Sequence, residues 1–296
     1  DGRVQDPDDF TVGVRTKDNY SGIASTVRTE GQGNADVVDI STNNLFITNG
    51  GQIVADTLGE GNAGTVKINA NENISVAGDS NGSFIGISSV VGQDKQNTEN
   101  NGSDTEVEVP SKRNAGTVEI NTKHLSLNNV AQVTTSNFAT GNAGTVKINA
   151  NDTIAINGNN NKKGIYSGIT SIGSGGPQIE RKGGVVDITT QNLSLSNGGQ
   201  LGSGNFKQGD GGSVKINASN NISVDGRVTD SLEDGSARSV PTSISSGIGP
   251  GIKGNAGIID ITTKSLSVTN SAQVGAVIQG EGNGGQLFIK ASDAIE

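Results

Sequence analysis

The decapeptide GNAGTVKINA occupies residues 61–70 and occurs again, unchanged, at residues 141–150. An identical segment 80 residues further along the chain indicates internal repetition. Repetition at a regular interval is typical of solenoids and other repeat architectures. The shorter pattern inside the decapeptide, an apolar–polar–apolar triplet, recurs along the rest of the chain and sets its period.

The triplet occurs eight times. Its copies are Val38-Asp39-Ile40, Val66-Lys67-Ile68, Val118-Glu119-Ile120, Val146-Lys147-Ile148, Val186-Asp187-Ile188, Val214-Lys215-Ile216, Ile259-Asp260-Ile261 and Leu287-Phe288-Ile289. Successive copies are 28, 52, 28, 40, 28, 45 and 28 residues apart, so a constant short unit alternates with a longer, variable one. The short units cover 34–61, 114–141, 182–209 and 255–282, and the long units cover 62–113, 142–181 and 210–254, with partial long units at 1–33 and 283–296. We therefore expect one repeat domain over residues 1–296.

Each short unit contains three brief apolar–polar alternations, such as Val38/Ile40 and Leu45/Ile47, separated by Gly, Asn, Ser and Thr. A period of two residues is typical of β-strands, and no helical pattern lies between them. The sequence thus predicts an all-β fold, a parallel β-helix of about eight turns with three strands per turn. Units that cannot bury a core alone do so by stacking, and the narrow core that results explains a hydrophobic content of only 31%.

Two columns of residues mark the corner before each triplet. Four residues ahead stand Asn34, Asn62, Asn114, Asn142, Lys182, Asp210, Asn255 and Asn283. Stacked turns would join the six asparagines in a side-chain amide ladder. Two residues ahead stand Asp36, Gly64, Gly116, Gly144, Gly184, Gly212, Gly257 and Gly285, a pattern that predicts a positive φ.

The middle residues of the triplets should point outward from the first strand. In order they are Asp39, Lys67, Glu119, Lys147, Asp187, Lys215 and Asp260, followed by Phe288. Acid and Lys alternate, so each acid would face a Lys one turn away, and a slip of one turn would oppose like charges. We expect this charge column to set the register, and the change Lys147→Glu to cost about 1–2 kcal/mol.

The outward residues of the second strand are small in every turn but the first. They are Phe46, Ser75, Ser126, Ala155, Ser194, Ser223 and Ser267. Two interpretations are open, a solvated face or a lateral packing surface.

A Gln follows the first residue of the triplet by 14 residues in every short unit, at Gln52, Gln132, Gln200 and Gln273. We expect these side chains to hydrogen-bond to turn backbone, with a ligand role as the alternative.

The long units hold the variation. Their third strand should begin in the segments at Tyr20, Phe84, Tyr166 and Pro241, with insertions just before it (77–83, 157–165, 225–240) and just after it (90–113, 172–183, 247–254). Loops on one face of a solenoid usually carry its specificity. Tyr20, Phe84 and Tyr166 recur on alternate turns and form a candidate glycan-contact strip, or else pack beneath the loops.

Composition excludes several kinds of chemistry. The chain has no Cys, so it has no disulfide, thiolate metal site or cysteine nucleophile. Its net charge of −9 argues against nucleic acid as a partner. The only His is His124, and it cannot form a multi-histidine metal site. We predict no cofactor, no metal and no membrane span, since no apolar run approaches the roughly 20 residues that a span requires.

Units of the form GNAGTVKINANENISVAG (61–78) and NAGTVEINTKHLSLNNVAQVTTSNFATG (114–141) resemble the repeats of large cyanobacterial exoproteins. Those are filamentous haemagglutinin-like proteins of two-partner secretion systems. The resemblance is clearest over residues 34–290 and implies a right-handed β-helix, exported to the cell surface or medium, that acts in adhesion, aggregation or matrix formation.

Three functions remain as hypotheses. The first is a non-catalytic, extracellular structural and adhesive rod that displays loops, the second a polysaccharide-binding module, and the third a β-helical polysaccharide lyase or hydrolase. An exposed aromatic strip would favour the second hypothesis, and a cleft with clustered carboxylates would favour the third. The expected partners are further copies of the chain, packed head to tail or laterally, and cell-surface glycans. Because residues 1–33 read as the end of a long unit and 283–296 as the start of one, we expect the rod to continue, in a longer chain or a filament.

Overall fold

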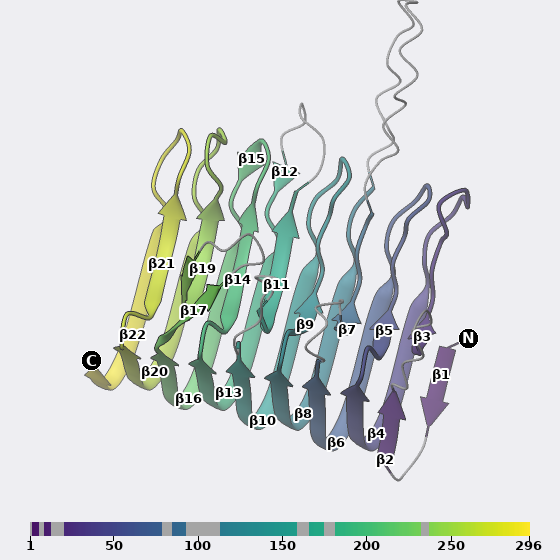
Figure 1. Cartoon of the computed structure of the whole chain (residues 1–296), viewed down its shortest axis with the longest axis horizontal. Coiled ribbons are helices and arrows are strands. Elements are labelled where there is room, and N and C mark those ends of the chain that lie inside the picture. Colours follow the sequence, from purple (N-terminus) through teal and green to yellow (C-terminus); the bar gives the residue numbers. More distant parts are fainter. Residues whose placement is uncertain are drawn as a thin grey trace, which may run out of the picture.

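The structure is a computed structural model that describes residues 2–5, 9–12, 21–78, 85–92, 113–158, 166–174, 181–231 and 237–296. Its described strands stack in chain order along one axis, and this confirms the parallel β-helix (Figure 1). The right hand of the coil stays a prediction, which the general preference of β-crossover-β connections favours. Tyr20, Phe84 and most of the insertion at 90–113 lie outside the described residues.

One sheet consists of the long strands that contain the triplets. They are β4 (Val37–Thr48), β6 (Thr65–Ala77), β8 (Thr117–Asn128), β10 (Thr145–Asn157), β13 (Val185–Ser196), β16 (Ser213–Asp225), β20 (Ile258–Thr269) and β22 (Gln286–Ile295), with β1 (Gly2–Gln5) and β2 (Asp9–Val12) both paired to β4. Neighbouring strands are parallel and the triplets are in register, so Val66 lies beside Val38 and Ile68 beside Ile40.

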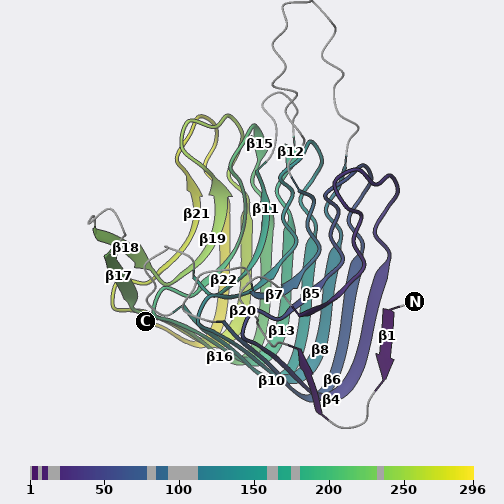
Figure 2. The same cartoon turned by 45° about the vertical axis from the view of Figure 1, so that its right-hand side comes forward.

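The second sheet forms the other long side of the rod. Its strands are β3 (Gly22–Ala24), β5 (Gln52–Val54), β7 (Ile85–Ser88), β9 (Ala131–Thr134), β11 (Gly168–Gly173), β14 (Gln200–Asn205), β19 (Ser243–Ile248) and β21 (Gln273–Ile278). At the corner that leads back to the first sheet, β12 (Arg181–Lys182) pairs with β15 (Gly209–Asp210). The insertion at 225–240 forms an antiparallel hairpin of β17 (Arg227–Ser231) and β18 (Ala237–Pro241), which projects from the side of the rod (Figure 2).

The expected first and second strands are the two arms of one bent strand, which corrects the expectation of three separate strands per turn. The register shifts at the bend, where Asn43 alone lies opposite Asn71 and Glu72. Such an extra residue bends a strand while pairing continues on both sides of it. A buried Thr marks the bend of each short turn, and the Thr190 hydroxyl donates to the carbonyl oxygens of Asp152 at 3.1 Å and Asn192 at 3.2 Å.

The core is a narrow channel of apolar side chains that continues from turn to turn. Its first complete turn contributes Val38, Ile40, Leu45, Ile47 and Ile53, each at most 1% exposed. Burying a side chain of this kind stabilises the fold by about 1.5–3 kcal/mol relative to leaving it exposed. Since few apolar residues per turn suffice, the chain remains folded with a low hydrophobic content.

The amide ladder at the corner is confirmed. The Asn34 Oδ1 accepts hydrogen bonds from the Asn62 backbone N–H at 2.8 Å and from the Asn62 side-chain amide at 3.2 Å. The same arrangement joins Asn62 to Asn114 and Asn255 to Asn283. Where Lys182 replaces Asn, its backbone N–H still donates to the Asn142 Oδ1, at 3.2 Å.

The glycine column at this corner has a different cause from the one predicted. Among the residues that the structure describes, the left-handed φ values at these corners belong to the glycines just before the ladder, such as Gly61 at 122°, and not to the column itself. In the column, a Cβ on Gly116 would stand 1.8 Å from the Gly64 carbonyl oxygen of the preceding turn and 2.5 Å from the Ser89 Oγ. Ser89 directly follows β7 of the second sheet and donates to the Gly64 carbonyl oxygen at 2.6 Å. The column therefore needs glycine because it lies close to the carbonyl oxygen of the column residue one turn before and, in most turns, also to a side chain from the opposite side of the rod.

Candidate functional surfaces

The charge column lies on adjacent strands in the predicted order. Asp39 is beside Lys67, Lys147 is between Glu119 and Asp187, and Arg3 precedes Asp39 in the register. None of the ion pairs found among the described residues joins two members of the column; the pairs are Glu72–Lys123, Asp152–His124 and Lys253–Glu281. The charges of the column are therefore partly or fully exposed to solvent and are not in ion-pair contact with one another.

The small outward column also lies in register, from Phe46 beside Ser75 to Ser223 beside Ser267. It follows the second arm of each bent strand and offers hydroxyl groups without titratable side chains. Hydroxyl groups of this kind bind water or a polar surface, and they provide no acid or base. Solvation and lateral packing therefore both remain open for this face.

His124 lies at the bend of β8, and its Nδ1 is 3.7 Å from the Asp152 Oδ2. Both side chains are more than a third exposed. Within the described ranges no three His, Cys, Asp or Glu side chains gather as metal ligands would. The His124–Asp152 pair is thus a surface contact between neighbouring turns.

Tyr166 does not serve as an exposed sugar-stacking ring, which corrects its place in the candidate glycan strip. Its side chain is 8% exposed and its hydroxyl donates to the Oδ2 of Asp230, a fully buried residue on β17. Burial and this hydrogen bond raise the pKa of Tyr166 to about 12. Tyr166 therefore holds the β17–β18 hairpin against the rod, and the packing interpretation is right for this residue.

Two of the glutamines in the short turns bind turn backbone as predicted. The Gln200 side-chain amide donates to the carbonyl oxygens of Gly198 at 2.9 Å and Pro241 at 2.8 Å. The Gln132 amide donates to the Tyr166 carbonyl oxygen at 3.4 Å. These contacts tie the two glutamines to the backbone near the start of the second sheet.

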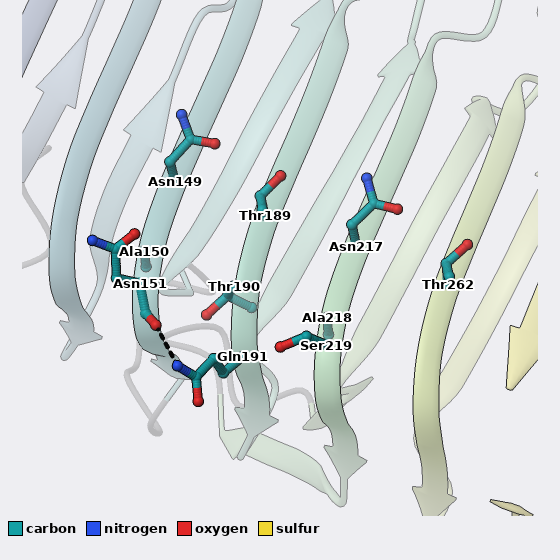
Figure 3. Close-up of a pocket in the computed structure, with 10 residues that line it drawn as sticks. All are labelled: Asn149, Ala150, Asn151, Thr189, Thr190, Gln191, Asn217, Ala218, Ser219 and Thr262. Atoms are coloured by element: carbon teal, nitrogen blue, oxygen red, sulfur yellow. Dashed lines mark hydrogen bonds between the residues drawn. The ribbon is translucent and has the colours of Figure 1, made fainter. Parts of the chain in front are cut away.

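A shallow, open groove of 310 Å³ follows the outside of the bend across β10, β13, β16 and β20 (Figure 3). Its lining is uncharged and consists of Asn149, Ala150, Asn151, Thr189, Thr190, Gln191, Asn217, Ala218, Ser219 and Thr262. Amide hydrogen bonds join Asn69, Asn121 and Asn149 at 3.0 Å, and the series stops at Thr189, which has no amide. The groove offers hydrogen-bond donors and acceptors without a titratable group.

A row of exposed apolar side chains, missed at the level of sequence, lies at the far end of the second sheet. Leu58, Phe138 and Phe206 are 47%, 38% and 51% exposed. They occupy the same position in three successive short turns, 20 residues after the first residue of the triplet. Gly92, Ser174 and Gly249 occupy that position in the long turns. This fixed spacing was the signal that could have revealed the row.

No protein-family model, curated protein or solved structure matches this chain. In the part of the chain that the structure describes, no helix has the length and hydropathy of a membrane span. Function must therefore be inferred from the fold and from the surfaces described above.

Proposed function

We propose that the chain is a non-catalytic structural and adhesive rod that works outside the cell. The observation that carries this proposal is the continuity of the stack: each triplet strand from β4 to β20 pairs in parallel with the strands one turn before and one turn after it. Interstrand hydrogen bonds in such a stack run along the rod axis, so a load along the axis is shared by many bonds in every turn.

The surface supports a display role over a catalytic one. Long turns alternate with short turns, and the described hairpin β17–β18 projects from a long turn (Figure 2). The acids of the charge column are two turns apart, roughly 9.6 Å, with Lys147 or Lys215 between them. A lysine between the two carboxylates leaves poor room for the attacking water of an inverting glycosidase.

Export is part of the proposal. The resemblance to filamentous haemagglutinin-like exoproteins supports it, and a chain without Cys can cross an envelope unfolded without forming mispaired disulfides. We propose two kinds of partner. The first is further copies of the chain, in lateral or head-to-tail contact, and the second is cell-surface glycans.

Antibody labelling of intact source cells tests the location, and the settling rate of a gene-deletion strain tests adhesion. We expect antibodies against the chain to label unpermeabilised cells, and the deletion strain to aggregate more slowly than the parent. Labelling that requires cell lysis, together with unchanged settling, would contradict the proposal.

A further inference from the structure

The row of Leu58, Phe138 and Phe206 does not belong to the core or to any contact that the proposed rod requires. Apolar side chains of this size are usually buried, and a repeated exposed set marks an interaction surface more often than a single exposed residue does. The row extends over five consecutive turns, with an apolar residue on every second turn.

Two of the three large side chains lie against the glycine of the next turn. The Cδ1 and Cε1 of Phe206 are 2.7 and 3.5 Å from where a Cβ on Gly249 would stand, and the Cδ2 of Leu58 is 2.7 Å from that point on Gly92. Any larger residue at Gly92 or Gly249 would push these side chains away. Gly92 and Gly249 therefore allow Leu58 and Phe206 to pack on the backbone of the next turn, while the rest of each side chain is exposed to solvent.

The backbone that carries the two rings is fixed by buried amides. Asn137 and Asn205, each fully buried, directly precede Phe138 and Phe206. The Asn137 Oδ1 accepts from the Ala139 N–H at 2.8 Å, and its amide donates to the Asn142 carbonyl oxygen at 2.8 Å. The Asn205 Oδ1 accepts from the Lys207 N–H at 3.1 Å. Rings held on such fixed turns lose little freedom when a ligand binds.

The spacing of the rings suits a ligand that repeats. Adjacent turns pair at this corner through backbone hydrogen bonds, such as Ser174 N–H to the Asn137 carbonyl oxygen at 2.7 Å and Phe206 N–H to the Gly173 carbonyl oxygen at 2.8 Å. Phe138 and Phe206 are therefore two turns apart, roughly 9.6 Å. Single rings separated by small residues make a narrow track, which differs from the compact, central hot spot of a protein–protein interface.

We propose that the row of Leu58, Phe138 and Phe206 binds a neutral, linear polysaccharide laid along the rod. The proposal rests on the adhesive function above and names its ligand class. Sugar rings present C–H faces that pack on the electron-rich face of an aromatic ring. The net charge of −9 disfavours anionic polymers and so favours a neutral polysaccharide over an anionic one.

Affinity electrophoresis of the 296-residue chain tests this proposal. The gels contain a β-linked glucan, a mannan or a xylan, each neutral, or polygalacturonate as the anionic comparison. We expect at least one neutral polymer to retard the chain and polygalacturonate to have no effect. Phe206→Ala should weaken binding about tenfold and Phe138→Ala by a similar factor, about 1.4 kcal/mol for each ring.

Phe288→Ala is the matched control, since Phe288 is 54% exposed but lies in the charge column. It should bind like the unmodified chain. Phe206→Trp should keep binding, whereas Phe206→Leu, which retains apolar area without a flat ring, should lose most of it. Circular dichroism establishes that each variant is folded, and the mild Leu and Trp exchanges keep the test informative if an Ala variant unfolds.

Three outcomes would overturn the proposal: no neutral polymer retards the chain, Phe288→Ala weakens binding as much as Phe206→Ala, or sedimentation shows self-association that Phe206→Ala abolishes. The last outcome would assign the row to contact between copies. If cells still aggregate through the chain while no polymer binds, only this inference fails. If a polymer binds but intact cells are not labelled, the proposed location fails instead.

Discussion

The column glycines let successive turns, and two sides of the rod, approach closely at the corner. In Gly184→Ala the new Cβ would overlap the Ser171 Oγ, which donates to the Gly144 carbonyl oxygen at 2.8 Å. Overpacking of this kind costs about 1–3 kcal/mol, so the chemical unfolding midpoint should fall. Gly284→Ala is the control because nothing lies within 4 Å of its Cβ position. Equal midpoints for the two variants would contradict the steric explanation.

The ionisation of Tyr166 should make the stability of the hairpin contact depend on pH. Its folded pKa of about 12 is above the unfolded value of 10, so the stability that the neutral phenol contributes is complete below pH 10 and is lost as the pH rises to 12. We expect the unmodified chain to lose stability in this window relative to Tyr166→Phe. At neutral pH the Phe variant should be less stable by about 1–3 kcal/mol, because the buried Asp230 carboxylate loses its donor.

Thermal unfolding of both proteins at intervals from pH 7 to 12 provides the measurement. Parallel pH profiles would show that the Tyr166 hydroxyl does not titrate in a buried contact with Asp230.

Tyr166 also shows what the sequence could not reveal. The recurrence of Tyr20, Phe84 and Tyr166 was visible, but the fold of the hairpin that covers Tyr166 was not, because residues 225–240 lack the repeat pattern.

At the scale of the strand, the charge column tests whether exposed charges set the register. Lys147 is exposed and has no close acidic partner among the described side chains, so Lys147→Glu should cost less than the 1–2 kcal/mol expected from sequence, at about 1 kcal/mol or below. The loss should shrink as salt is added. Lys147→Gln, which removes the charge without reversing it, should have about half the effect. If both variants lose the same free energy of unfolding at every salt concentration, the cause is altered packing and not charge.

The insertion after β7 should be dispensable for folding. Gly92 N–H donates to the Thr57 carbonyl oxygen at 2.8 Å, and the Arg113 guanidinium donates to the Gly59 carbonyl oxygen, so both ends of the insertion lie on the same neighbouring turn. Deleting 94–110 leaves four residues between Gly92 and Asn114, one more than between Phe138 and Asn142 in a short turn. We expect an unchanged β-sheet circular dichroism spectrum, because loop length has a weak effect on stability. Loss of that spectrum would place the segment in the core.

The strands and their register could be predicted from the sequence where the triplet pattern repeats. The triplets determined the register of the first sheet, since a strand alternates its side chains and shifting it by one residue would expose Val38 and Ile40. The same alternation could not reveal that the two arms join, because the one-residue bulge opposite Asn43 leaves both apolar patterns intact. It also says nothing of glycine geometry, because the close approach of Ser89 to Gly116 joins residues on different sides of the rod.

Over the whole molecule, each triplet strand from β4 to β22 contacts mainly its neighbours in the stack and the second-sheet strands of its own and adjacent turns. Stability in such an array is close to a sum of turn and interface contributions, so damage to one turn should spread a limited distance. Ile148 lies fully buried in the middle of the described stack, on β10. Ile148→Ala should destabilise the chain by about 2–5 kcal/mol, and Ile148→Val, as the mild control, by about 0.5–1.5 kcal/mol.

Hydrogen exchange resolved along the chain distinguishes a stack of this kind from one cooperative globule. In Ile148→Ala we expect the amides of β8, β10 and β13 to lose most protection, because these strands pack directly on the cavity. Protection in β20 should change little, since β16 lies between it and β13. Ile148→Val should show the same spatial pattern with a smaller amplitude. A uniform loss of protection from β4 to β20 would mean that the turns unfold together, and the rod would then transmit a local defect along its whole described length.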